Sequence, residues 1–88
     1  MVREELQAAS DELNEAASMA DGETRERIEG QADELATLAS AERGPDQGRL
    51  DRHMNILREL SGDAGDGAEH VERALEHVEE YRKGVSGI

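Results

Sequence analysis

The three histidines have the widest choice of chemistry in this sequence: His53, His70 and His77. An imidazole can bind a metal, act as a general base or change its charge near neutral pH. His53 falls within a helical stripe of large apolar residues, so we expect a buried histidine held by hydrogen bonds. Its partner would come from the second or fourth helix, and the candidates are Gln31, Thr24, Tyr81 or a carboxylate. The abundance of carboxylates favours a raised pKa for His53 over the lowered pKa that burial alone would produce.

His70 and His77 are separated by seven positions, which is about 10 Å along a helix axis. Two histidines that share a metal from one helix are normally four positions apart. The Glu-x-x-His signature of di-iron bundles is also absent, because Leu50, Gly67 and Ala74 stand three positions before the histidines. We therefore predict no metal and no cofactor. The alternative is a small metal- or ligand-binding bundle that uses His53, His70 and His77.

The sequence offers little else for catalysis. The acidic, glycine-rich run 62–67 lacks the calcium-loop pattern, and we interpret it as a flexible, solvated hinge. No glycine-rich phosphate loop and no G-x-S-x-G nucleophile elbow is present. We predict that the chain is not an enzyme.

Basic charge gathers around the third predicted helix, where we expect ion pairs with acids of neighbouring helices. The residues concerned are Arg43, Arg49, Arg52 and Arg58. The functional alternative is a small anion site at the start of that helix, where free backbone amides favour negative charge.

The charge balance indicates the solvent in which the protein works. The 88 residues include 22 acids and 10 bases, with Lys83 the one lysine, and the net charge is −12. Such a chain repels itself at low salt, and molar salt screens that repulsion. We predict an intracellular, cytoplasmic protein of a salt-accumulating organism. The acid excess argues against nucleic acid and anionic membranes, and no apolar run is long enough to span a bilayer.

Apolar residues recur at helical spacing in four segments, predicted as helices at about 2–20, 23–42, 46–61 and 68–83. Asp21 and Asp66 are the predicted caps of the second and fourth helices. The third helix has the densest stripe, including Leu57, and we expect the others to pack against it. Short connections favour antiparallel neighbours. The fold class is thus all-α, an up-down antiparallel four-helix bundle in a single domain, 1–88.

Two segments carry a resemblance: AERGPDQGRLDRHMNILREL and the ending EHVEEYRKGVSGI. From about Asp11 onward the chain resembles a family of small acidic helical proteins of unknown function from halophilic archaea. The R-G-P-D-x-G-R-L segment and the E-Y-R-x-x-V-x-G ending are the most specific parts. The resemblance implies no activity.

Five residues match the motif positions of that family: Asp46, Gly48, Arg49, His53 and Tyr81. Together with His70 and His77, four of them (Asp46, Arg49, His53 and Tyr81) are our candidate interaction or structural polar residues. We predict that the chain is a structural or protein-interaction module. It would work as a homodimer or with another protein.

Overall fold

The structure is a computed structural model that describes residues 3–85. Within that range it contains four α-helices, one short 3₁₀ turn and no strand. The helices are α1 (Glu4–Ser18), α2 (Gly22–Ser40), α3 (Gln47–Asp63) and α4 (Ala68–Lys83), and the 3₁₀ turn η1 (Gly65–Gly67) leads into α4. The predicted all-α fold is confirmed.

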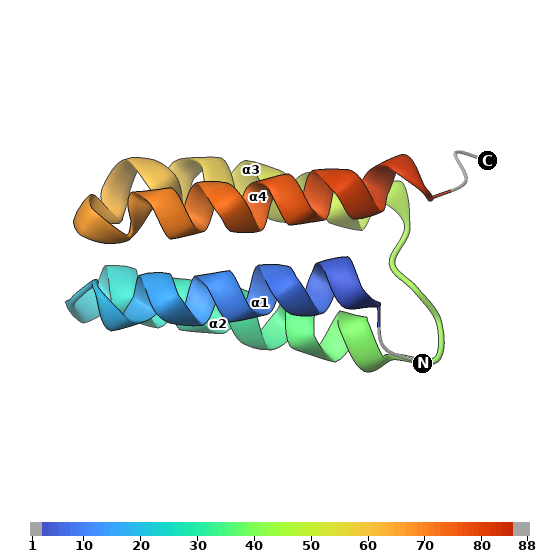
Figure 1. The fold of residues 1–88 in the computed structure, drawn as a ribbon, viewed down its shortest axis with the longest axis horizontal. Helices are drawn as coiled ribbons and strands as arrows, with labels where there is room; N and C mark the ends of the chain where they lie inside the picture. Colours follow the sequence, from blue (N-terminus) through green and yellow to red (C-terminus); the bar gives the residue numbers. More distant parts are fainter. Residues whose placement is uncertain (1–2, 86–88) are drawn as a thin grey trace.

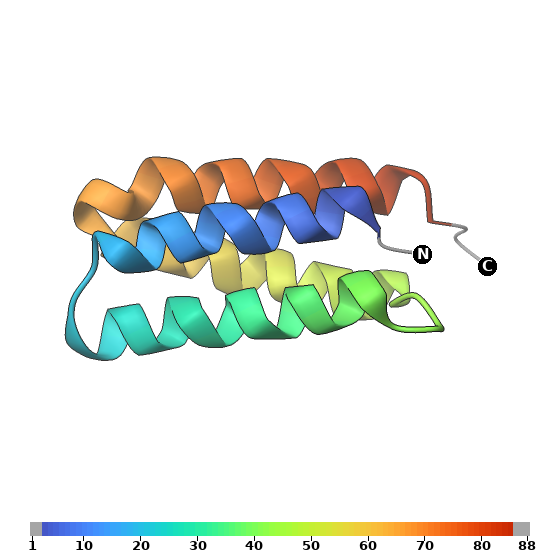
Figure 2. The same cartoon turned by 60° about the horizontal axis from the view of Figure 1, so that its bottom comes forward.

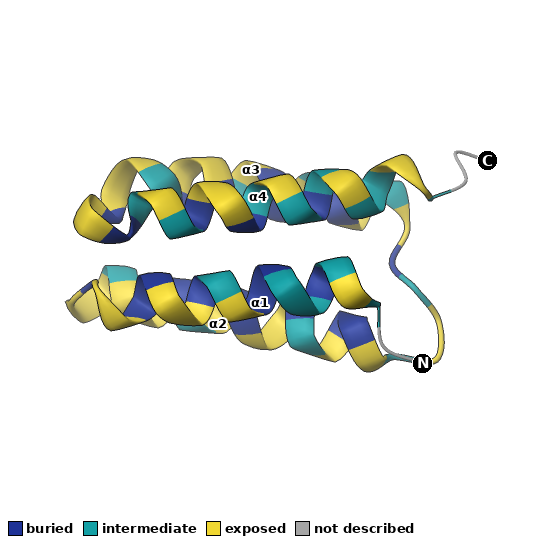
Figure 3. Ribbon diagram, viewed as in Figure 1, coloured by how far each residue is buried: buried dark blue, intermediate teal, exposed yellow. Residues whose placement is uncertain are grey.

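The helices run up and down as two hairpins, α1–α2 and α3–α4, laid side by side (Figures 1 and 2). α1 begins and α4 ends at the same end of the bundle. Buried residues lie on the faces that the helices turn toward one another, and exposed residues cover the outside (Figure 3). The radius of gyration is 12.1 Å, close to the value of about 12 Å expected for a compact domain of this length.

The core follows the apolar stripes. Each helix contributes leucine, isoleucine or valine side chains with no exposed surface, among them Leu6, Leu13, Leu35, Leu57 and Val78. The stripe of α1 alternates leucine with alanine, and the small alanines let its neighbours approach closely. No described helix is both long enough and apolar enough to cross a membrane.

The centre of the bundle differs from the prediction. α1, not α3, is the helix with the most extensive packing, because it contacts both α2 and α4 along its length. α3 packs along α4, but its contact with α2 is sparse. The density of large residues in α3 indicated burial correctly, since Leu57 is fully buried. It did not indicate which helix lies between the others, because that depends on how closely two backbones can approach.

The helix ends also differ from the predicted ones: α3 continues two residues further than predicted, through Gly62 to Asp63. α1 and α2 end earlier than expected, at Ser18 and Ser40, and the predicted stripe residue Val2 lies outside the described residues. Asp21 occupies the N-cap position of α2 as predicted, but its side chain makes no capping hydrogen bond. The cap prediction for Asp66 was wrong, because Asp66 belongs to η1. Asp46 is the aspartate that does cap a helix.

Gly67 explains why the run 62–67 is structured rather than a simple hinge. This glycine is buried where the start of α4 meets α1, and a Cβ added there would lie 2.8 Å from the carbonyl oxygen of Ala16. Such a contact is too short for any side chain. The turn before α4 therefore packs against the end of α1, and the glycine makes this approach sterically feasible.

Candidate functional site

A hollow of about 430 Å³ lies between α2 and α3, on the side of the bundle where these two helices make sparse contact. The middle of α2 and the first half of α3 provide its walls. The residues that line it are Gln31, Glu34, Gly48, Arg49, Arg52, His53 and Ile56. It therefore contains five of the residues singled out from the sequence: Gln31, Gly48, Arg49, Arg52 and His53.

His53 and Gln31 form the buried floor of this hollow. The side chains are 4% and 8% exposed, and the imidazole Nδ1 lies 2.7 Å from the amide oxygen Oε1 of Gln31. The amide nitrogen of Gln31 in turn donates to the carboxylate of Glu34 at 3.3 Å. Because the amide oxygen only accepts, Nδ1 carries the hydrogen. The prediction of a buried, hydrogen-bonded His53 with a partner from the second or fourth helix is confirmed, and the partner is Gln31, one of the named candidates.

The second ring nitrogen of His53 has a different environment. Nε2 has no hydrogen-bond partner among residues 3–85, yet in that range no fully buried side-chain nitrogen or oxygen lacks a partner. Nε2 therefore reaches the solvent that fills the hollow. With Nδ1 protonated, the neutral ring presents the lone pair of Nε2 to that solvent.

Burial lowers the pKa of His53, because desolvation disfavours the cation. Glu34 opposes this effect, and Arg49 and Arg52 add to it. The predicted raised pKa was wrong. The hydrogen-bond partner is a neutral amide rather than a carboxylate, so the direct contact supplies no negative charge to offset the burial.

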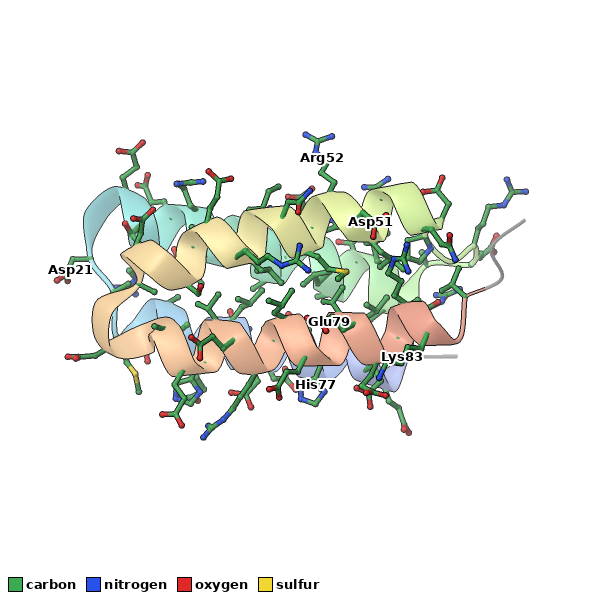
Figure 4. The ribbon with its side chains drawn as sticks, turned by 90° about the horizontal axis from the view of Figure 1, so that it is seen from above. Asp21, Asp51, Arg52, His77, Glu79 and Lys83 are labelled. Atoms are coloured by element: carbon green, nitrogen blue, oxygen red, sulfur yellow. The ribbon has the colours of Figure 1, made fainter. Side chains whose placement is uncertain are left out.

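Arg49 and Arg52 stand at the hollow without acidic partners. Both are exposed, and neither forms an ion pair within residues 3–85. Figure 4 shows Arg52 projecting from α3 away from the body of the bundle. The predicted ion pairs of Arg43, Arg49, Arg52 and Arg58 are not found in the described part of the chain, where Arg58 donates to Asn55. The bidentate ion pair of α3 instead joins Asp51 to Arg82 of α4.

His70 and His77 lie elsewhere, at the junction of α1 and α4. His70 Nδ1 is 2.7 Å from Glu12 Oε1, and His77 Nδ1 is 2.8 Å from Glu5 Oε2. The three histidines are therefore not brought together, and residues 3–85 contain no cluster of three potential metal ligands from His, Cys, Asp and Glu. The alternative of one site using His53, His70 and His77 is contradicted by this geometry.

Asp46 and Tyr81 have structural positions. Asp46 precedes α3, and its Oδ1 accepts a hydrogen bond of 2.8 Å from the backbone N–H of Arg49, as an N-cap does. Tyr81 is half-buried near the end of α4, and its hydroxyl lies close to Gly44 in the connection before α3. Asp46 thus fixes the first turn of α3, beside the hollow, without lining it.

Two structural polar residues were missed from the sequence. The guanidinium of Arg3 donates to the carbonyls of Leu38 and Ala41, at 3.0 and 2.7 Å, and so caps the C-terminal end of α2. Ser10, buried in α1, donates to the carbonyl of Ala32. The pairs of His70 and His77 had a readable signal, because Glu5 and Glu12 share their seven-residue spacing. Arg3 had none, since its partners are backbone carbonyls.

The fold and the hollow define a small acidic helical bundle with a polar, partly open side. The chain belongs to a family of unknown function (DUF7553), which its residues 1–84 match. No curated protein and no solved structure matches the chain.

Proposed function

We propose that the chain is a salt-adapted structural or protein-interaction module without catalytic activity, which works in the cytoplasm of a halophilic archaeon. Its polar side chains support the structural part of this proposal. His70, His77 and Arg3 each hold two helices together, and none of them lines the hollow. The net charge of −12 supports adaptation to salt.

The observation that carries the interaction proposal is the sparse contact between α2 and α3. The other three pairs of neighbouring helices are closely packed, whereas this seam leaves Ile56 half-buried beside two arginines without acidic partners. A partner helix or a second copy of the chain would cover Ile56 and offer carboxylates to Arg49 and Arg52. Arginine at a partly desolvated surface is a common anchor of protein interfaces.

Light scattering after size exclusion, in KCl on the order of 1 M to screen the net charge, tests this proposal. We expect a homodimer, or a monomer that forms a complex of defined mass with a protein captured from native lysate. Arg52→Glu should abolish either complex, and the control Arg58→Glu, on the same helix outside the hollow, should leave it intact. A monomer that captures nothing, or complexes insensitive to Arg52→Glu, would contradict the interaction role.

A further inference from the structure

We propose that the hollow between α2 and α3 binds a small phosphate-type oxyanion, held by the guanidinium groups of Arg49 and Arg52 and by Nε2 of His53. This inference goes beyond the proposed function, because it concerns a ligand of the isolated chain and requires no protein partner.

The first support is the unused donors on one side of α3. Arg49 and Arg52 each carry a planar guanidinium group, whose geometry matches phosphate and carboxylate oxygens. Arg52, which projects outward from α3 (Figure 4), would turn its flexible side chain over the hollow to reach the ion. The hollow also borders Gly48 in the first turn of α3, where a backbone N–H has no intrahelical acceptor. Gly48 has no side chain to keep an anion away from that amide, and the helix dipole favours negative charge there, although the Asp46 carboxylate that caps this turn lies close by and opposes a second anion.

The second and independent support is the unpartnered nitrogen of His53. This side chain is 4% exposed, it lines the hollow, and Nδ1 is already occupied by Gln31. Nε2 reaches the hollow and has no hydrogen-bond partner among residues 3–85, so it can bond to a group that enters there. Nε2 of the neutral ring is an acceptor, so its natural partner is an O–H group of a ligand that also has negative oxygens for the two arginines.

A phosphate meets both requirements. Near neutral pH inorganic phosphate carries negative oxygens and still retains a proton, because its last O–H ionises only at strongly alkaline pH. Sulfate and acetate have oxygens for the arginines but no proton to donate at this pH. The hollow should therefore prefer phosphate over both whenever His53 is neutral.

Glu34 opposes this binding, because its carboxylate lies on the α2 wall of the same hollow. The charged groups that act on His53 are Glu34 from α2 and Arg49 and Arg52 from α3. The lining carries two positive charges and one negative charge, in a chain whose net charge is −12, and Glu34 acts on His53 more strongly than either arginine does. Removal of the Glu34 charge should therefore tighten anion binding, while removal of either arginine should weaken it.

The experiment is an NMR titration of the full chain with inorganic phosphate at pH 7.5 and constant KCl, following the histidine ring signals and the Gly48 amide. We expect the His53 ring and Gly48 to shift, and the rings of His70 and His77 to stay in place as internal controls. Arg49→Gln and Arg52→Gln should each weaken binding by about tenfold or more, which is about 1.4 kcal/mol. Glu34→Gln should tighten it, and Arg58→Gln should leave it unchanged.

Sulfate, acetate and a phosphomonoester form the comparison arms. Sulfate should bind poorly at pH 7.5 and better once the pH is low enough to protonate His53, because the protonated ring is a donor at Nε2. At pH 7.5 the monoester has lost its second proton and has no O–H to donate to Nε2, so inorganic phosphate should bind more tightly, and equal binding of the two would contradict the role of the O–H group. The proposal is overturned if phosphate leaves the His53 signals in place, if the arginine variants bind as tightly as the parent, or if sulfate or acetate binds equally well at pH 7.5.

Discussion

The imidazole of His53 in α3 and the side-chain amide of Gln31 in α2 meet at 2.7 Å across the most sparsely packed pair of neighbouring helices in the bundle. This hydrogen bond joins the two helical hairpins where apolar packing contributes little. It also determines which ring nitrogen of His53 faces the hollow, and so what the hollow can bind.

Stability should fall as the solution is acidified through the ordinary histidine pKa. The pKa of His53 is lowered in the folded state, mainly by burial, so the unfolded chain binds the proton more readily. The contribution of neutral His53 is then fully present above about pH 6.5, the unfolded value, and is lost as the pH falls below it. NMR titration of the His53 ring would measure its pKa in the folded state. Urea unfolding between pH 5.5 and 7.5 would measure how the free energy of unfolding depends on pH.

Gln31→Glu is the matched variant for this measurement. A carboxylate in contact with Nδ1 stabilises the cation, so the pKa of His53 should rise and the sign of the pH dependence should reverse. The stability of the His53–Glu pair would then be present below about pH 6.5 and lost as the pH rises through the folded value. Identical His53 titrations in the parent and in Gln31→Glu would contradict the contact.

Gly67→Ala should destabilise the fold because the new methyl group would overlap the Ala16 carbonyl. Overpacking of this kind typically lowers the free energy of unfolding by about 1–3 kcal/mol. The control is Gly62→Ala, at a helical position with open space around it, which should stabilise by about 0.5–1 kcal/mol. Chemical denaturation should show that the free energy of unfolding falls in Gly67→Ala and rises in Gly62→Ala. Equal changes in the two variants would contradict the close approach of α1 and α4.

The sequence predicted the elements well and their mutual positions less well. Helical periodicity identified the segments and the burial of His53 and Leu57, because one helix determines which of its residues share a face. The central position of α1 and the close approach at Gly67 depend on two helices together. Neither is encoded in the periodicity of one segment.

The candidate site was predicted in part for the same reason. His53 and Arg49 were named from their positions on α3, and both line the hollow. Their partners were predicted less well: Gln31 was one of several candidates for His53, and the 22 acids offered the arginines many equivalent carboxylates. The structure selects a neutral amide for His53 and leaves Arg49 and Arg52 without acidic partners in the described residues. Tertiary geometry decides these pairings, and the charge pattern does not.

Leu57→Ala should be strongly destabilising, because Leu57 is fully buried in the core. The loss of its packed methyl groups leaves a cavity, and such changes lower the free energy of unfolding by about 2–5 kcal/mol. Urea denaturation at constant KCl would measure the change. A loss below about 1 kcal/mol would mean that α3 contributes little to the core.

Arg3→Gln should remove the cap from the C-terminal end of α2. The guanidinium donates to the carbonyls of Leu38 and Ala41, where the helix dipole places negative partial charge. We expect a loss of about 1 kcal/mol in the free energy of unfolding. Arg25→Gln is the control: it removes only an exposed ion pair with Glu29, so its effect should be a few tenths of a kcal/mol. Equal effects of the two substitutions would contradict the capping role.

The fold should weaken as KCl is diluted. The 22 acids outnumber the 10 bases, and the Debye length grows from about 3 Å at 1 M salt to about 10 Å at 0.1 M, so that repulsion reaches across neighbouring helices. Circular dichroism melts at several KCl concentrations should show a melting temperature that falls on dilution.

A variant with fewer acids separates this charge repulsion from the general stabilising effect of salt on apolar packing. Glu26→Gln, Asp33→Asn and Glu72→Gln together remove three exposed charges from side chains that form no ion pair with described residues. If self-repulsion causes the salt dependence, the triple variant should melt higher at low KCl and approach the parent at high KCl, because screening removes the difference between them. Parallel curves for the two proteins, or a melting temperature of the parent that is flat or rises on dilution, would show that net charge does not govern its stability.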